Sequence, residues 1–181
     1  MNAVDNGWLR QATRLQSPNR DQRPSGAIPS LLVIHNISLP PGQFGNGAIA
    51  RFFTNCLDHR AHPYYQAIEG VQVSAHLLID RVGAITQFVS FNERAWHAGV
   101  SCFQGQEKCN DFSIGIELEG TDALPYTDLQ YETLVQVTRD LMTEYPLITI
   151  DRIVGHSDIA PERKTDPGPS FEWARYKTLI A

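Results

Sequence analysis

Apolar residues, some in continuous runs and some alternating with polar ones, predict five β-strands along the chain. Residues 31–36 form an apolar run that is typical of a buried central strand. Residues 74–80 and 84–89 flank a short turn and predict a hairpin. Residues 112–118 alternate with period two, and 153–156 form a short strand that ends in a histidine. Helical and irregular segments separate these strands.

Three segments have helical character. The first covers residues 48–57, with its apolar side chains spaced for one face. The second begins after Thr127, because Thr127 and Gln130 form a capping box, and ends near Tyr145, where Pro146 prevents continuation. The third runs from Ser170 or Phe171 to Leu179. We expect irregular structure over the remaining stretches, which are 15–30, 38–47, 58–70, 90–111 and 160–169.

Strands and helices are interleaved and include one hairpin, which predicts an α/β (α+β) protein with a mixed central β-sheet flanked by helices. A chain of this length can bury one good core, so we expect a single domain. Residues 1–30, polar and proline-rich in their second half, are predicted to be an N-terminal arm packed on this domain. Residues 31–181 are predicted to form the domain itself.

Composition excludes several classes of partner. The 181 residues include 15 Lys plus Arg and 20 Asp plus Glu, a formal charge of −5, which argues against binding a nucleic-acid backbone. We expect no membrane partner, because no run approaches the roughly 18 apolar residues of a membrane span. The N-terminus lacks the pattern of a secretory signal. Cys56, Cys102 and Cys109 show no CxxC spacing, and an odd, low count fits a reducing compartment, so we expect the cytoplasm.

Two histidines end apolar strands, and an aspartate follows the second of them. His35 closes the first strand, His156 closes the last, and Asp166 lies ten residues beyond in a proline-braced loop. Two imidazoles and one carboxylate are a recognised ligand set for catalytic Zn²⁺, with one position left for water. Spacing alone is weak support, because 121 residues separate the histidines. Half-buried histidines with backbone partners are the more common alternative.

The other four histidines point less clearly to chemistry. His59 and His62 lie in polar loop sequence, and His76 lies within a strand, where a hydrogen-bonded core histidine is the usual outcome. His97 follows a tryptophan between small residues, a pattern that suits either a cleft wall or an edge turn.

Glu117 and Lys164 each have two open interpretations. Gly115 leaves room for a ligand on the face of its strand that carries Glu117, where partial desolvation would raise the pKa of a carboxyl toward the range of a general base. Alternatively the sheet is covered on one side and Glu117 faces solvent, as Glu119 on the same face suggests. Lys164 could stabilise an oxyanion beside Asp166, or it could be an ordinary solvated lysine.

Six segments together resemble one family. They read HNISLPPGQFG (35–45), SAHLLID (74–80), RAWHAGVS (94–101), CNDFSIGIELEGTD (109–122), YTDLQY (126–131) and GHSDIAPERKTDPGPSF (155–171). They are similar to the AmpD-type family of cytoplasmic 1,6-anhydro-N-acetylmuramyl-L-alanine amidases, which act in Gram-negative peptidoglycan recycling. The resemblance covers nearly the whole chain and implies a fold like that of the peptidoglycan recognition proteins.

The resemblance also implies a set of functional residues. It implies zinc held by His35, His156 and Asp166, a catalytic acid at Glu117 and an oxyanion-stabilising lysine at Lys164. The implied substrate is a small muropeptide, and we expect the chain to act as a monomer. Candidate substrate contacts are Asn36, His97 and Lys108.

The chain departs from the family pattern at Gln72, where we expect a basic residue, and around Lys108, where arginine is less frequent than in relatives. The exact substrate contacts therefore stay open. The alternative function is a muropeptide-binding module without catalysis, which the complete ligand set disfavours. A zinc amidase acting on intact cell wall would need an export signal, which we do not find in the sequence.

Overall fold

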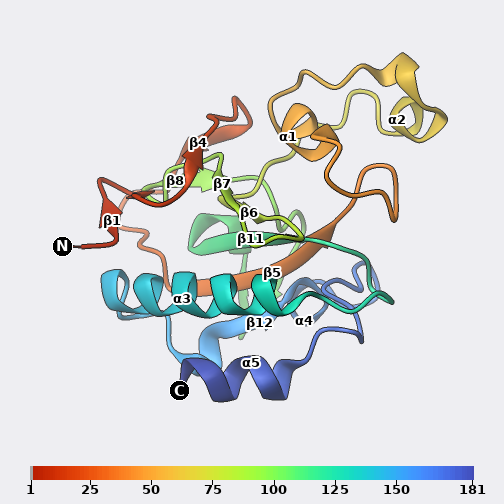
Figure 1. Cartoon of the computed structure of the whole chain (residues 1–181). Coiled ribbons are helices and arrows are strands. Elements are labelled where there is room, and N and C mark those ends of the chain that lie inside the picture. Colours follow the sequence, from red (N-terminus) through yellow and green to blue (C-terminus); the bar gives the residue numbers. More distant parts are fainter. Residues whose placement is uncertain (1) are drawn as a thin grey trace.

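The protein is described here from a computed structural model that covers residues 2–181. A six-stranded mixed sheet forms its centre (Figure 1). In spatial order its strands are β12 (Ile153–Gly155), β5 (Leu31–Ile37), β11 (Ser113–Glu119), β6 (Leu77–Ile79), β7 (Ile85–Gln87) and β3 (Thr13–Arg14). The first four are mutually parallel, β6 and β7 form the predicted antiparallel hairpin, and β3 runs parallel to β7. The predicted mixed sheet is confirmed.

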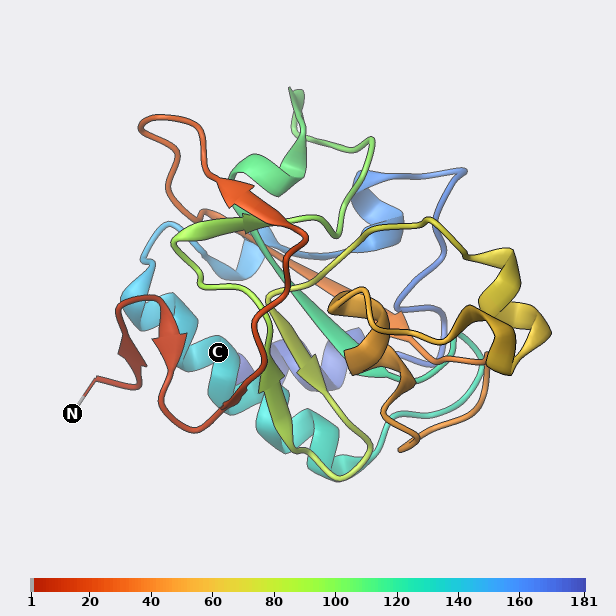
Figure 2. The same cartoon turned by 90° about the horizontal axis from the view of Figure 1, so that it is seen from above.

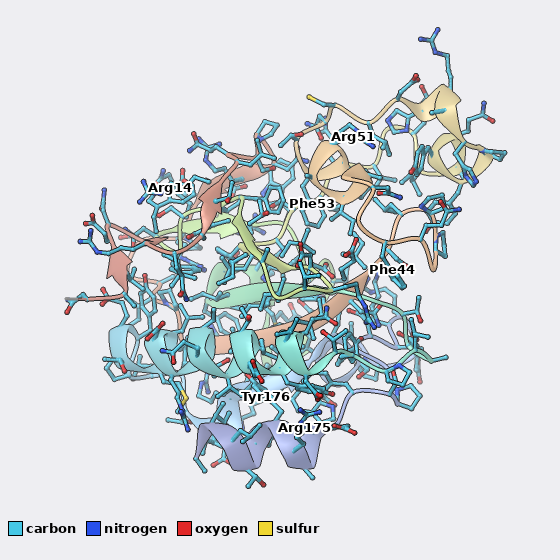
Figure 3. The ribbon with its side chains drawn as sticks, in the orientation of Figure 1. Arg14, Phe44, Arg51, Phe53, Arg175 and Tyr176 are labelled. Carbon is cyan, nitrogen blue, oxygen red and sulfur yellow. The ribbon has the colours of Figure 1, made fainter. Side chains whose placement is uncertain are left out.

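Two helices cover one face of this sheet. In Figure 1, α3 (Asp128–Glu144) crosses in front of the strands and α5 (Trp173–Ile180) lies below them. The apolar face of β11 packs against them, as its alternation predicted. Tyr176 of α5 is buried between the two helices, and its hydroxyl lies 2.6 Å from the Thr138 hydroxyl of α3 (Figure 3). This face is the apolar core of the molecule.

The opposite face is covered as well. α1 (Ala48–Phe53) packs there, with Phe53 directed toward the sheet and against Phe88 (Figure 3). The segment between β7 and β11 adds to this cover. Ala95 of β8 (Glu93–Ala95) packs with α1, and Phe103 of β9 (Cys102–Phe103) and Cys109 of the 3-10 helix η2 (Cys109–Asp111) pack with β5. β10 (Gln106–Glu107) pairs with β9 and is exposed. All seven residues of β11 are consequently buried. The alternative of a one-sided sheet with a solvent-facing Glu117 is therefore wrong.

The capping box of α3 is present as predicted. The Thr127 hydroxyl accepts a hydrogen bond from the Gln130 backbone N–H, and the Gln130 side chain accepts one from the Thr127 N–H. α1 is shorter than expected, because Asn55 adopts a left-handed conformation at φ 59° and ends the turn. α5 begins at Trp173, slightly later than predicted. A further 3-10 turn, η3 (Ile150–Arg152), precedes β12.

Residues 58–70 are more regular than predicted. They contain η1 (His59–Ala61) and α2 (Pro63–Ala67). The His62 side chain accepts a hydrogen bond from the Tyr64 N–H, and Pro63 occupies the first helical position, where its missing N–H costs nothing. A histidine cap is rare, which is why the sequence pattern did not reveal this helix.

The first 30 residues run across the outside of the fold, on the side nearest the viewer in Figure 2. β1 (Val4–Asp5) and β2 (Trp8–Leu9) pair with each other, β3 extends the central sheet, and β4 (Arg20–Gln22) pairs with β8. The expectation of wholly irregular structure over 15–30 is thus wrong at β4. The guanidinium of Arg23 donates to the carbonyls of Phe91 and Ser113, which ties this segment to β11. A domain boundary at residue 30 stays a prediction.

The parallel strands bring three chain segments to one edge of the sheet. Glu117 of β11 pairs with His35 of β5, and Gly155 of β12 pairs with Ile34. His156 therefore follows at the level of His35, although it is the first residue of the short helix α4 (His156–Ile159) and not the last of a strand as predicted. Within the described residues, no helix has the length and apolar character needed to cross a bilayer.

Candidate active site and metal centre

Three side chains converge at the carboxyl edge of the sheet. His35 Nδ1 lies 3.0 Å from His156 Nδ1 and 3.0 Å from Asp166 Oδ2, and His156 Nδ1 lies 3.1 Å from the same carboxylate oxygen. These three atoms are close enough to one another to bind a single metal ion. The sequence predicted this group as a ligand set, and the fold brings all three members together.

The proton of the His156 imidazole can be placed from its second nitrogen. His156 Nε2 lies 3.1 Å from the Ala98 carbonyl oxygen, which can only accept, so Nε2 carries the proton and Nδ1 presents a lone pair. Asp166 adds a negatively charged oxygen. Electron-rich atoms in mutual contact repel one another unless a cation or a proton lies between them. Two imidazole nitrogens and a carboxylate oxygen are ligands that zinc prefers, so the residues fit this ion.

The electrostatics keep His35 and Asp166 in the protonation states that metal binding requires. Burial lowers the pKa of His35 to about 4, because the charged imidazolium loses its hydration. Burial by itself would raise the pKa of Asp166. In the metal-free site the Nδ1 atoms of His156 and His35 can carry the protons that a bound metal would replace, and their hydrogen bonds to the carboxylate outweigh burial and lower that pKa below its usual range. A neutral imidazole and an ionised carboxylate are the forms that bind metal.

Glu117 lies beside this group and has an unused oxygen. Its side chain is buried, and Glu117 Oε2 has no hydrogen-bond partner among residues 2–181. Burial raises the pKa of Glu117 well above its usual value, the nearby Asp166 raises it further, and Lys164 opposes both. A buried carboxyl without a partner costs free energy, so its retention in a cavity indicates a functional role.

A cavity of about 690 Å³ connects these groups. His35, Glu117, His156, Lys164 and Asp166 all line it. Lys164 is exposed on the rim, two residues from Asp166 in the loop that follows α4. A cavity of this size, lined by both charged and aromatic side chains, is typical of a small-molecule site.

The predicted substrate contacts lie in different places. Asn36 and His97 line this cavity, but Lys108 does not. Lys108 lines a second cavity of about 550 Å³, and Gln72 is exposed outside both. The amide N–H₂ of Asn36 donates to Asp122 Oδ1 and to the Pro167 carbonyl, so this side chain also holds the loop next to Asp166.

The remaining histidines have structural partners. His59 Nδ1 lies 2.7 Å from the Tyr65 carbonyl, and His62 caps α2. His76 is fully buried, accepts a hydrogen bond from the Gly115 N–H at Nδ1 and lies 3.1 Å from the Glu93 carbonyl through Nε2. The prediction that His76 is a hydrogen-bonded core residue is confirmed.

Several cavity residues were not singled out from the sequence. Tyr64 and Trp96 add aromatic surface, and Thr165 lies between Lys164 and Asp166. Tyr126 donates from its hydroxyl to the Pro167 carbonyl, and so helps to hold the ligand loop. The sequence did offer a signal for Trp96, because a tryptophan directly before His97 and between small residues suits a cleft wall. Nothing local to Tyr64 indicated that α2 would reach the cavity.

Comparison with known proteins agrees with this geometry. A family described as N-acetylmuramoyl-L-alanine amidase matches residues 25–169. The 1,6-anhydro-N-acetylmuramyl-L-alanine amidase AmpD of Citrobacter freundii is 59% identical over 177 residues, which are 98% of this chain and 94% of that protein.

Solved structures show the same relationship. A crystal structure of a selenomethionine derivative of AmpD superposes with a TM-score of 0.96 at 59% identity, over 98% of this chain and 99% of that one. The Escherichia coli amidase AmiD, solved with the substrate anhydro-N-acetylmuramic acid-L-Ala-D-gamma-Glu-L-Lys, superposes with a TM-score of 0.62 at 29% identity, over 87% and 60% of the two chains. The chain therefore belongs to the N-acetylmuramoyl-L-alanine amidase family.

Proposed function

We propose that this amidase is a zinc enzyme that hydrolyses the amide between 1,6-anhydro-N-acetylmuramic acid and L-alanine in muropeptides released during peptidoglycan recycling. One observation carries the proposal. The ligand group His35, His156 and Asp166 shares a cavity with Lys164 and with the buried carboxyl of Glu117, whose Oε2 has no hydrogen-bond partner among residues 2–181. Such a combination can activate water, exchange protons and stabilise negative charge at one amide bond.

The relatives support the choice of substrate. The curated relative from C. freundii bears the name of a 1,6-anhydro-N-acetylmuramyl-L-alanine amidase, and the match extends over nearly the whole of both chains. AmiD is described in complex with an anhydro-muropeptide as its substrate. The cavity here is large enough for a sugar and the first residues of a peptide, and its polar and aromatic walls suit both.

The ligand residues prepare the site before substrate arrives. Burial keeps His35 neutral, and Asp166 is ionised, which are the forms that bind a metal ion. Two neutral imidazoles and one carboxylate would carry one negative charge toward a divalent ion. When bound there, zinc polarises a carbonyl and lowers the pKa of water towards about 7. Asn36 and Tyr126 hold the Pro167 carbonyl, which keeps the adjacent Asp166 in place during turnover.

Glu117 is the residue that moves the proton. Hydrolysis of an amide consumes one water and yields a carboxyl group and an amine, so a proton must pass from the water to the leaving nitrogen. Glu117 Oε2 is free to accept that proton and then to donate it to the amine of L-alanine. Its raised pKa suits both halves of the transfer, because a carboxyl is an efficient acid and base when its pKa approaches the working pH.

Lys164 provides positive charge where negative charge develops. The tetrahedral intermediate of amide hydrolysis carries an oxyanion on the former carbonyl oxygen. Lys164 lines the cavity two residues from Asp166 and can direct its ammonium group at that oxygen. A donor of this kind accelerates the reaction because it interacts more strongly with the transition state than with the substrate.

Location and oligomeric state complete the proposal. We place the enzyme in the cytoplasm, as a monomer. Cys56, Cys102 and Cys109 are free in the structure, which fits a reducing compartment. Cell fractionation with an antibody to the chain, and light scattering during gel filtration, test these two points.

The decisive experiment incubates the purified protein with an anhydro-muropeptide and identifies the products by mass spectrometry. We expect anhydro-N-acetylmuramic acid and a free peptide that begins with L-alanine. A chelator should stop the reaction and added Zn²⁺ should restore it. His156→Ala should lose bound metal, measured by atomic absorption, while the control His59→Ala, outside the ligand group, should keep it. Binding of the muropeptide without any cleavage would instead favour the non-catalytic module.

A further inference from the structure

The imidazole of His35 has a second partner behind the ligand group. His35 Nε2, the nitrogen that faces away from Asp166, lies 2.9 Å from His97 Nδ1, and the two rings meet edge to face at 84°. His97 Nε2 in turn lies 3.0 Å from the Ser113 hydroxyl oxygen. A continuous chain of hydrogen bonds therefore runs from Ser113 in β11 through His97 to His35.

The metal-ligand role of His35 determines which atoms donate and which accept along these hydrogen bonds. His35 Nδ1 must present a lone pair to a metal ion, so in the neutral ring the proton sits on Nε2. His35 Nε2–H then donates to His97 Nδ1, which leaves the proton of His97 on Nε2, where it donates to the Ser113 hydroxyl. Each ring is held in the one tautomer that keeps His35 Nδ1 available.

The backbone around His97 is built to hold the ring in this position. The Asn110 side-chain oxygen accepts hydrogen bonds from the N–H groups of His97 and Ala98, which fixes the chain at this point. Gly115 of β11 lies directly under the ring, and a Cβ at Gly115 would come within 2.5 Å of His97 Cγ. The missing side chain of Gly115 therefore makes room for the imidazole of His97, whereas the sequence suggested room for a ligand.

We propose that His97 is a positioning residue that sets the tautomer and orientation of His35 through a Ser113–His97–His35 chain, and thereby raises the affinity of the site for zinc. Metal-binding histidines commonly donate their second N–H to a carboxylate or a carbonyl oxygen. Here a second imidazole takes that place, and a buried serine fixes its proton in turn. The inference rests on the proposed zinc site.

This role is distinct from the substrate contact that the sequence suggested for His97. His97 lines the cavity, so loss of activity in a His97 variant could arise from either role. Ser113 separates the two, because it is completely buried and does not line the cavity. If His97 only contacts substrate, Ser113→Ala should leave the zinc affinity unchanged. If the hydrogen bonds from Ser113 through His97 orient His35, the same substitution should lower the zinc affinity measurably.

The test compares the zinc affinities of four purified variants with that of the wild type by competition with a chromogenic chelator. His97→Val removes the acceptor and should weaken binding by about 10–100-fold. His97→Asn keeps an oxygen near the position of Nδ1 and should recover part of this loss. Ser113→Ala should weaken binding less, by about 2–10-fold. Ser90 is also buried but takes no part in the hydrogen bonds from Ser113 to His35, so Ser90→Ala should leave the zinc affinity unchanged.

Nitrogen-resolved NMR of the zinc-loaded wild type gives an independent readout. The imidazole spectrum should show the proton of His35 on Nε2 and that of His97 on Nε2, and the His97 signal should change in Ser113→Ala. Unchanged zinc affinity in both His97→Val and Ser113→Ala, with a change only in KM, would overturn the proposal. Failure of the wild type to bind zinc at all would instead overturn the proposed function.

Discussion

Two glutamates on one face of β11 lie two residues apart and have different environments. Glu119 is buried, but its two carboxylate oxygens accept hydrogen bonds from the backbone N–H groups of Gly45 and Arg81. Glu117 is buried to a similar extent, yet its Oε2 has no partner among the described residues. Glu119 joins two loops to the sheet, and Glu117 faces the cavity.

The difference shows that burial alone does not indicate chemistry. A carboxylate that accepts two hydrogen bonds from backbone amides is stabilised as an anion and contributes to the fold. A buried carboxyl without such partners is costly, and it also keeps an oxygen available for proton transfer. The same strand therefore supplies one residue for structure and one for reactivity, and mutation should separate the two roles.

The largest expected effect belongs to Glu117→Gln. The variant cannot exchange a proton, so kcat/KM for the muropeptide should fall by about 10²–10⁴-fold. Zinc content and the fold should be preserved, because a glutamine has the size of the glutamate and carries no charge that needs hydration. Steady-state kinetics, with metal analysis and circular dichroism, measure these quantities. Near-normal turnover would show that another group moves the proton.

Lys164→Ala should have the next largest effect. Loss of one donor to an oxyanion typically lowers kcat by about 10²–10³-fold. Lys164 is exposed, so the free energy of unfolding should change little. Lys177→Ala in α5, a partly exposed lysine that does not line the cavity, is the control and should have normal kcat. If the two variants had equal activity, Lys164 would be an ordinary surface lysine.

Glu119→Gln should show the opposite pattern, with a cost in stability and a small effect on chemistry. The new amide N–H₂ would face a backbone N–H in place of an accepting oxygen, which leaves a buried donor unpaired and costs about 1–3 kcal/mol. Urea denaturation measures this cost. At a temperature where the variant is folded, kcat should stay within about 10-fold of the wild type. A greater loss of kcat than in Glu117→Gln would reverse the comparison.

The smallest effect is a pH dependence of stability in the metal-free protein. Burial, and secondarily Asp166, raise the pKa of Glu117 well above its usual value of 4.5 in the folded state. Above pH 4.5 the unfolded chain has released this proton while the folded chain still binds it. Stability is therefore lost as pH rises from 4.5 toward the folded pKa.

Glu117→Gln removes this contribution. In the metal-free state its Tm should exceed that of the wild type by a margin that grows between pH 4.5 and neutral pH. Calorimetry at several pH values tests the sign. A margin that shrinks as pH rises would mean that the Glu117 carboxylate is stabilised in the fold, and would contradict its unpartnered state.

Local patterns in the sequence were sufficient for much of the fold. Alternation in β11 placed Ile114, Ile116 and Leu118 on the helix-covered face, since residues of a strand point to alternate sides. The pair Thr127 and Gln130 marked the start of α3, because a capping box is made within four residues. The family motifs named the members of the ligand group, and the structure confirms that they converge.

Long-range contacts decided the rest. The sequence left the polar face of β11 open to solvent or to a ligand, and only the tertiary structure showed that this face is covered and Glu117 buried. It could not show that Glu119 would meet the N–H groups of Gly45 and Arg81, or that His97 would lie against His35. Such pairs join residues far apart in the chain, so their distances depend on the register of parallel strands and on the paths of loops.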